Sequence, residues 1–106
     1  MADFYLKQND TKPSIQATLK NADGTAIDLT DATVDFHMSL NGVNVVDAAA
    51  VVVTALSGIV RYDWAAADTD TPGTYDIEWE ITFVDASIRT VPNSRHDKLV
   101  IYPELH

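Results

Sequence analysis

The sequence predicts an all-β domain, a sandwich or barrel of seven or eight short strands, and three observations lead to this prediction. Polar and apolar residues alternate with period two in several segments, as in strands with one buried face. Turn-forming clusters recur roughly every 8–12 residues. No segment has the periodicity and length of a core helix. The 106 residues, 46% of them hydrophobic, fit one domain over residues 1–106.

Two early segments carry the alternation most clearly. Residues 14–20 place Ile15, Ala17 and Leu19 on one side of a strand. Residues 33–40 bury a second apolar set and turn polar residues outward; the buried set is Val34, Phe36, Met38 and Leu40. The short connections predict that neighbouring strands are antiparallel.

Asn41-Gly42 predicts a two-residue type I′ hairpin that pairs Leu40 with Val43. Continuing this register would place Asp47 beside Phe36 on the buried face. We therefore expect the pairing to stop or bulge near Val46.

Ser57-Gly58 predicts a second hairpin, in which Leu56 pairs with Ile59 and Val53 with Tyr62. One face of this hairpin is expected in the core: Val51, Val53, Ala55, Val60, Tyr62 and Trp64. The other face carries Val52, Leu56 and Ile59 and is apolar enough to contact a partner. Residues 64–68 are rich in helix formers and could form one short helical turn.

The longest strand is expected at 73–85, with large apolar side chains at odd positions and Asp76, Glu78 and Glu80 between them. Acid–base catalysis requires a desolvated carboxylate. Because these three face away from the core, we expect a solvated surface. A turn at residues 85–86 would place Arg89 beside Thr82 and diagonal to Glu80. Strands at 88–91 and 98–102 complete the set.

No catalytic, cofactor or metal site is expected, and the chain is not predicted to be an enzyme. It has no cysteine, no G-x-S-x-G elbow and no glycine-rich phosphate loop. Its histidines are not at a metal-ligand spacing and are expected on the surface; they are His37, His96 and His106. A calcium site is an alternative for the aspartates Asp63, Asp68, Asp70 and Asp76, although they lack the EF-hand order. A sugar platform is an alternative to core packing for Trp64, Tyr75 and Trp79.

The charge balance argues against two classes of partner. Seven basic and 16 acidic residues give a net charge of −9. Such a surface repels nucleic acid and anionic membranes. The N-terminus has no signal-peptide pattern, and the most apolar stretch is too short to span a bilayer.

Two long stretches resemble one family. "NDTKPSIQATLKNADGTAIDLTDATVDFHM", residues 9–38, is similar to the pattern of the N-terminal domain of tailed-phage baseplate upper proteins and their stand-alone relatives. "VRYDWAAADTDTPGTYDIEWEITFVDASIRTVP", residues 60–92, resembles the same family from its Y-x-W strand through G-T-Y into a long hairpin.

The resemblance implies an immunoglobulin-like antiparallel β-sandwich that serves as a structural docking module of a phage or prophage virion, in tail, baseplate, neck or head. It implies a virion location, after synthesis in the bacterial host cytoplasm. The expected partners are other virion proteins and a second copy of the chain. The expected contacts are Phe4, Tyr5, Leu6, Val52, Leu56 and Ile59. The alternative function is a carbohydrate- or calcium-binding β-sandwich module.

Overall fold

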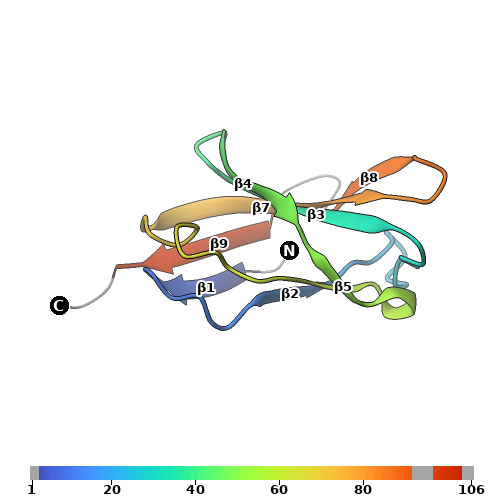
Figure 1. Cartoon of the computed structure of the whole chain (residues 1–106), viewed down its shortest axis with the longest axis horizontal. Coiled ribbons are helices and arrows are strands. Elements are labelled where there is room, and N and C mark those ends of the chain that lie inside the picture. The colour runs from blue at the N-terminus through green and yellow to red at the C-terminus, as the bar shows by residue number, and fades with distance from the viewer. Residues whose placement is uncertain (1–2, 92–96, 104–106) are drawn as a thin grey trace.

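Two β-sheets pack face to face in the computed structural model, which describes residues 3–91 and 97–103 (Figure 1). The larger sheet contains β1 (Asp3–Lys7), β3 (Thr33–Leu40), β4 (Val43–Ala49), β7 (Gly73–Thr82), β8 (Ile88–Val91) and β9 (Asp97–Tyr102). The smaller sheet contains β2 (Ile15–Thr18), β5 (Val51–Thr54) and β6 (Ile59–Tyr62). The predicted class, an immunoglobulin-like β-sandwich, is confirmed. None of the described residues belongs to a helix long and apolar enough to cross a membrane.

The larger sheet has the order β1-β9-β7-β3-β4, with β8 also paired to β7. Strand β7 pairs with β9 through residues 73–77 and with β8 through residues 79–82. The prediction that all strands are antiparallel is wrong for β1, which pairs parallel with β9. These two strands lie at opposite ends of the sequence, so no short connection restricts their relative direction.

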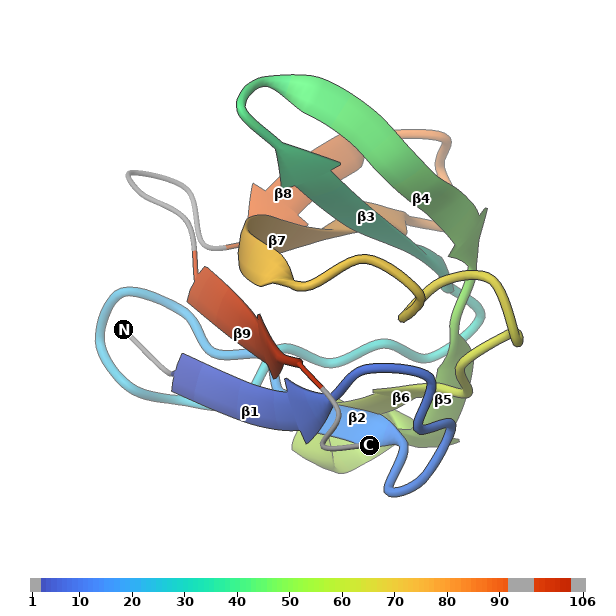
Figure 2. The ribbon, with the colours of Figure 1, turned by 90° about the vertical axis from the view of Figure 1, so that its left-hand side faces the viewer.

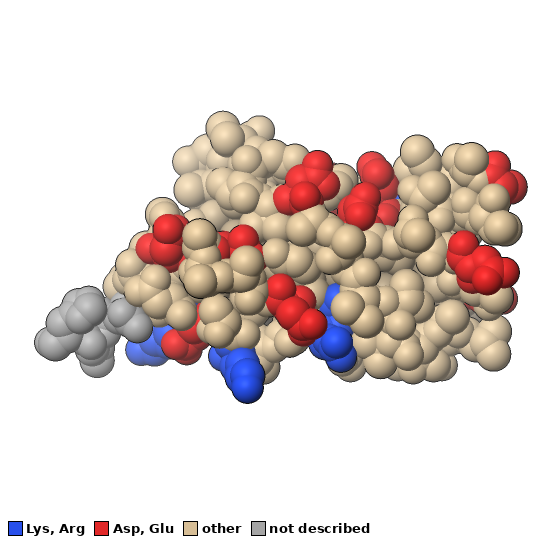
Figure 3. Space-filling view, viewed as in Figure 1, with Lys and Arg blue, Asp and Glu red and all other residues tan. Residues whose placement is uncertain are grey.

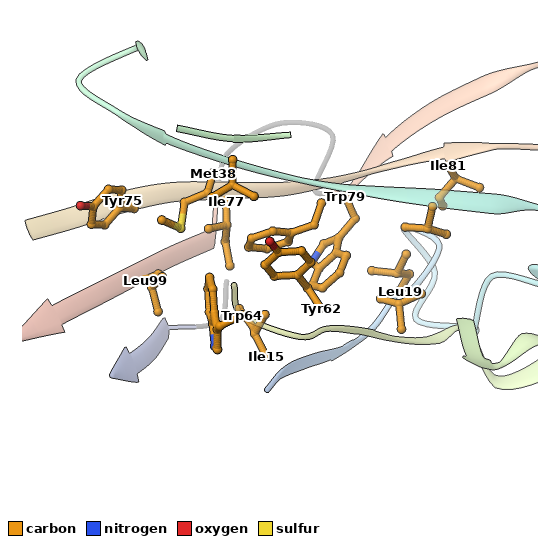
Figure 4. Packing of buried hydrophobic residues seen from close by; sticks show 14 of the residues in the cluster. Ile15, Leu19, Met38, Tyr62, Trp64, Tyr75, Ile77, Trp79, Ile81 and Leu99 are labelled. Carbon is orange, nitrogen blue, oxygen red and sulfur yellow. The ribbon is translucent and has the colours of Figure 1, made fainter. Parts of the chain in front are cut away.

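Aromatic side chains join the two sheets at the centre of the core (Figure 4). Phe36 of β3 stacks on Tyr62 of β6, with ring centroids 4.6 Å apart and planes 15° apart. Its centroid lies 4.8 Å from that of Trp79, which is opposite it on β7. Trp64 packs edge-on against both Phe36 and Tyr62. Large aromatic groups bury much apolar area each, so this cluster is a main source of stability.

Tyr75 ties the start of β7 to the preceding loop. Its ring is buried, and its hydroxyl donates a hydrogen bond of 2.5 Å to the carbonyl of Thr71. A tyrosine bonded to backbone just upstream at this strand is a feature of immunoglobulin-like sandwiches. The tie fixes the direction in which β7 enters the sheet.

The β3–β4 hairpin forms at Asn41-Gly42 as predicted, with Leu40 opposite Val43. The expected irregularity lies between Met38 and Ser39, and beyond it Met38 pairs with Val46. The bulge places Asp47 opposite His37 on the outer face of the sheet. A charged residue is thereby kept out of the core.

The predicted register of the second hairpin is wrong. A 3-10 turn, η1 (Ala55–Ser57), lengthens the connection, and Val52 pairs with Val60. As a result Val51 and Val53 are exposed, while Val52 packs against the core. The change follows from the period of two, because a shift of one residue exchanges the faces of a strand.

A shift of one residue in the pairing of β7 with β8 also changes the position of Arg89 from the predicted one. Arg89 stands opposite Ile81 rather than Thr82, and its guanidinium donates to the Asn21 side chain over 2.7 Å. The predicted placement of Arg89 near Glu80 is therefore wrong. The predicted helical turn at residues 64–68 is a hydrogen-bonded turn, closed by the amide of Asp68 and the carbonyl of Ala65.

Gly58 should tolerate alanine far less well than Gly42, although both have positive φ. A Cβ on Gly58 (φ 67°) would lie 2.6 Å from the carbonyl oxygen of Leu19, whereas nothing lies within 4 Å of one on Gly42 (φ 82°). We expect Gly58→Ala to lower the free energy of unfolding by about 3 kcal/mol and Gly42→Ala by about 1 kcal/mol. Urea unfolding measures both values, and equal losses would contradict the packing described for Gly58.

Candidate metal centre

The outer face of the larger sheet brings together three possible metal ligands. Asp35 and His37 on β3 and Glu80 on β7 each offer one ligand atom, and these atoms lie within 4.8 Å of one another. All three side chains are partly exposed. Within the described part of the chain, no other group of three His, Asp or Glu residues meets this criterion.

The pairing of two central strands positions this group. Asp35 is directly opposite Glu80, and His37 is directly opposite Glu78. Residues between them on the same strands, Phe36 and Trp79, point into the core. Because successive side chains of a strand point to opposite faces, burial of Phe36 and Trp79 holds the polar residues beside them on the outer face.

His37 lies between two further carboxylates. Its Nε2 atom is 3.1 Å from Oδ1 of Asp47, and its Nδ1 atom is 4.0 Å from Oε1 of Glu78. The His37 side chain is 18% exposed, against 63% for Asp47 and 30% for Glu78. The imidazole is therefore oriented by its surroundings more strongly than an isolated surface histidine would be.

Two carboxylates of the group lie directly opposite each other on paired strands. Asp35 and Glu80 are like charges in directly opposed positions, an arrangement that destabilises a sheet. Three basic side chains of the described residues have other partners: Lys98 bonds Asp76, Arg61 pairs with Asp63, and Arg89 bonds Asn21. A bound cation would offset this repulsion.

The four aspartates considered for calcium do not converge. Asp63 accepts from the Ser14 hydroxyl, a bond that lowers the pKa of Asp63, and also pairs with Arg61. Asp68 accepts hydrogen bonds from the Tyr62 hydroxyl and from the Ala65 amide. Burial of Tyr62 and its hydrogen bond to Asp68 raise the pKa of Tyr62. The other two bond different neighbours, Thr71 for Asp70 and Lys98 for Asp76. Each carboxylate thus has a local structural role.

The aromatics considered for a sugar platform are buried, as predicted for core residues. Trp64, Tyr75 and Trp79 are 8%, 2% and 1% exposed. Flat sugar-binding surfaces require exposed rings, so these three do not supply one.

The six predicted contact residues form two separate groups. Phe4, Tyr5 and Leu6 lie on β1 in the larger sheet, where only Tyr5, at 60%, is strongly exposed. The others lie on or beside the smaller sheet: Val52 and Ile59 are partly buried, and Leu56 is 75% exposed. His37 is on the outer face as expected, while His96 and His106 lie outside the described residues.

Sequence reasoning did not find the candidate group because its members come from strands distant in the sequence. The available signal was an alternating D-x-H at residues 35–37 and an E-x-E at residues 78–80. Each motif alone is typical of a solvated face. Only the pairing of β3 with β7, which the hairpin signals do not reveal, brings them together.

Comparisons with known proteins show the fold and leave the family open. No family model matches the chain, and no curated protein does. A solved structure that does match is CopC from Methylosinus trichosporium OB3b, with a TM-score of 0.56 and 12% identity over 100% of this chain and 89% of that one. At this identity the likeness shows the sandwich fold alone.

The comparison corrects the predicted function. The expected role as a structural protein of a phage virion is wrong, because the whole chain matches CopC, which points away from such a role. No comparison supports a phage, virion or tail protein either. The resemblance to the baseplate family, and the virion location inferred from it, stay predictions.

The like-charge pair can be tested without metal. In a chelating buffer, Glu80→Gln should raise the free energy of unfolding by about 0.5 kcal/mol, because it removes repulsion with Asp35. The matched control is Asp76→Asn on the same strand and face, which should lower that free energy by a similar amount because it breaks the pair with Lys98. Denaturant titration measures both, and a loss for Glu80→Gln would contradict the proposed repulsion.

Proposed function

We propose that this protein binds a divalent transition-metal ion on the outer face of its larger sheet. The observation that carries the proposal is the convergence of Asp35, His37 and Glu80, with ligand atoms within 4.8 Å of one another. Two carboxylates and an imidazole are ligands that such ions take in proteins.

The distances suit an ion after a small adjustment. A tetrahedral ion with bonds of about 2.0–2.2 Å holds its ligand atoms about 3.3–3.6 Å apart. Ligand atoms that lie within 4.8 Å of one another therefore need to draw together by at most about 1.5 Å. Partly exposed side chains can do this by rotation, without moving the strands.

The imidazole selects among cations. Calcium and magnesium prefer sites made of oxygen atoms alone, and calcium takes six to eight of them. A histidine with two carboxylates instead favours zinc, copper(II) or nickel. Asp47 lies against one ring nitrogen of His37, the position of a carboxylate that orients a metal-binding histidine.

The support beneath the site is rigid. The ligands stand on two adjacent central strands whose opposite faces carry fully buried side chains, among them Phe36 and Trp79. Sites on such strands hold their geometry better than sites on loops. The partial exposure of the ligands would let an ion exchange with solvent.

Zinc titration of the chelator-treated protein tests the proposal. We expect one ion per chain, and at least tenfold weaker binding in His37→Ala and Asp35→Asn, because each removes a ligand. Asp70→Asn is the matched control, since it removes an aspartate from a loop away from the site. Calcium should not compete at equal concentration.

Calorimetry gives the stoichiometry and affinity, and NMR should show that the His37 ring signals shift on addition of zinc. Binding should weaken in acid, because protons compete for the imidazole and the carboxylates. Equal zinc affinity in the wild type and Asp35→Asn would refute the proposed site.

A further inference from the structure

Strand β1 lies at an edge of the larger sheet, and no strand of the described residues pairs with its outer side. Its other side pairs with β9, and the amide of Gln8, just beyond β1, donates to the Tyr102 carbonyl over 2.7 Å. Alternate residues of a strand bond to the same side. The backbone groups of Phe4 and Leu6 therefore face β9, and those of Asp3, Tyr5 and Lys7 face away from it, where the Lys7 carbonyl already accepts a hydrogen bond from the Asp10 amide over 3.1 Å.

The end of β1 is held in place by the loop that precedes β7. The Asn9 amide donates to the carbonyl of Thr69, and the Thr69 hydroxyl donates to the carbonyl of Asp10, both over 2.9 Å. Thr69 is fully buried, and the Gln8 side chain donates to the Asp70 carbonyl. A strand fixed in this way loses little entropy when a partner binds its edge.

An apolar hollow of about 240 Å³ adjoins this edge, between β1 and β2. Phe4, Leu6, Pro13, Ile15 and Trp64 are among the residues that line it. Figure 2 shows β1 and β2 close together at this side of the sandwich, each at the end of its own sheet. Exposed edges with apolar centres are sites of strand addition.

We propose that β1 pairs antiparallel with β1 of a second copy of this chain, about a two-fold axis at Tyr5. The sequence of β1, "DFYLK", is complementary to itself in this register. Asp3 stands opposite Lys7 of the second copy, Phe4 opposite Leu6, and Tyr5 opposite Tyr5. Opposite charges, apolar pairs and aromatic pairs all stabilise neighbouring strands.

The side chains fit both faces of the joined sheet. Tyr5 stacks on Tyr102 of β9, with ring centroids 6.1 Å apart and planes 16° apart. They are 60% and 47% exposed. The two-fold axis would bring two such pairs side by side on the outer face. On the inner face, Phe4 and Leu6 of both copies would cover the hollow.

Charge favours this edge over the opposite one. Each copy carries a net charge of −9, so association requires local attraction. On the face of Figure 3, Lys and Arg side chains gather mainly toward the side where β1 and β2 lie in Figure 1. Strand β4, the other edge of the path, contains Asp47 as its one charged residue and offers no opposite-charge pair to itself.

Charge exchange between positions 3 and 7 tests the proposal. The interface is small, so we expect a weak wild-type dimer with a dissociation constant on the order of 10–1000 µM by sedimentation equilibrium. Asp3→Lys and Lys7→Asp should each weaken it about tenfold, because two attractive pairs become repulsive. The double variant should restore wild-type association. No tag should precede residue 1, and a chelator keeps the experiment independent of the proposed metal centre.

Net charge provides an internal control. Asp3→Lys changes the net charge from −9 to −7 (−9 + 2), and Lys7→Asp changes it to −11 (−9 − 2). General repulsion predicts stronger association for the first variant and weaker for the second, whereas the proposed pairing predicts weaker association for both. A mixture of the two single variants should form heterodimers, since each provides the charges that the other lacks.

Three results would overturn the proposal. One is a wild type that stays monomeric at about 1 mM. Another is a pair of single variants that associate like the wild type. The third is a mixture of folded single variants, checked by circular dichroism, that forms no heterodimer.

Discussion

The pairing of β3 with β7 is the constraint on which the rest of the structure depends. In this register Phe36 faces Trp79 inside the sandwich, and Asp35 faces Glu80 outside it. On one side the pair is extended by β4, and on the other by β8 and β9. A slip of β3 by one residue would expose Phe36 and bury Asp35 and His37, so the core and the outer face select the same register.

The same register links stability to the proposed binding site. The aromatic contacts of Phe36 with Tyr62 and Trp79 fix the backbone that carries Asp35, His37 and Glu80. The carboxylates of Asp35 and Glu80 can therefore lie close together on the outer face without disrupting the fold, because packing on the inner face stabilises the two strands. A bound cation would offset the repulsion between Asp35 and Glu80.

Local patterns predicted much of the fold. Alternation in 33–40 and 73–83 identified the central strands and their buried faces, and Asn41-Gly42 identified a hairpin whose bulge follows from keeping Asp47 out of the core. The Ser57-Gly58 hairpin failed because η1 adds residues to the connection, which reverses the faces of Val51 and Val52. Strand β1 was missed because five residues without clear alternation become a strand only beside β9.

The candidate site could not be predicted for a related reason. Its residues were predicted on the right faces, but their neighbours on other strands were unknown, since three strands and a long loop separate β3 from β7 in the sequence. Outward-facing acidic residues are common on strands, and only the direct opposition of Asp35 and Glu80 distinguishes these. Position in the sheet, more than residue type, makes the group a candidate ligand set.

The most direct test is a crystal structure of the protein grown with zinc, with anomalous diffraction recorded at the zinc absorption edge. We predict one strong anomalous peak within bonding distance, about 2.0–2.2 Å, of Asp35, His37 and Glu80. The same map should show Phe36 opposite Trp79 beneath it. A peak elsewhere with these three side chains pointing apart, or no peak at saturating zinc, would contradict the account.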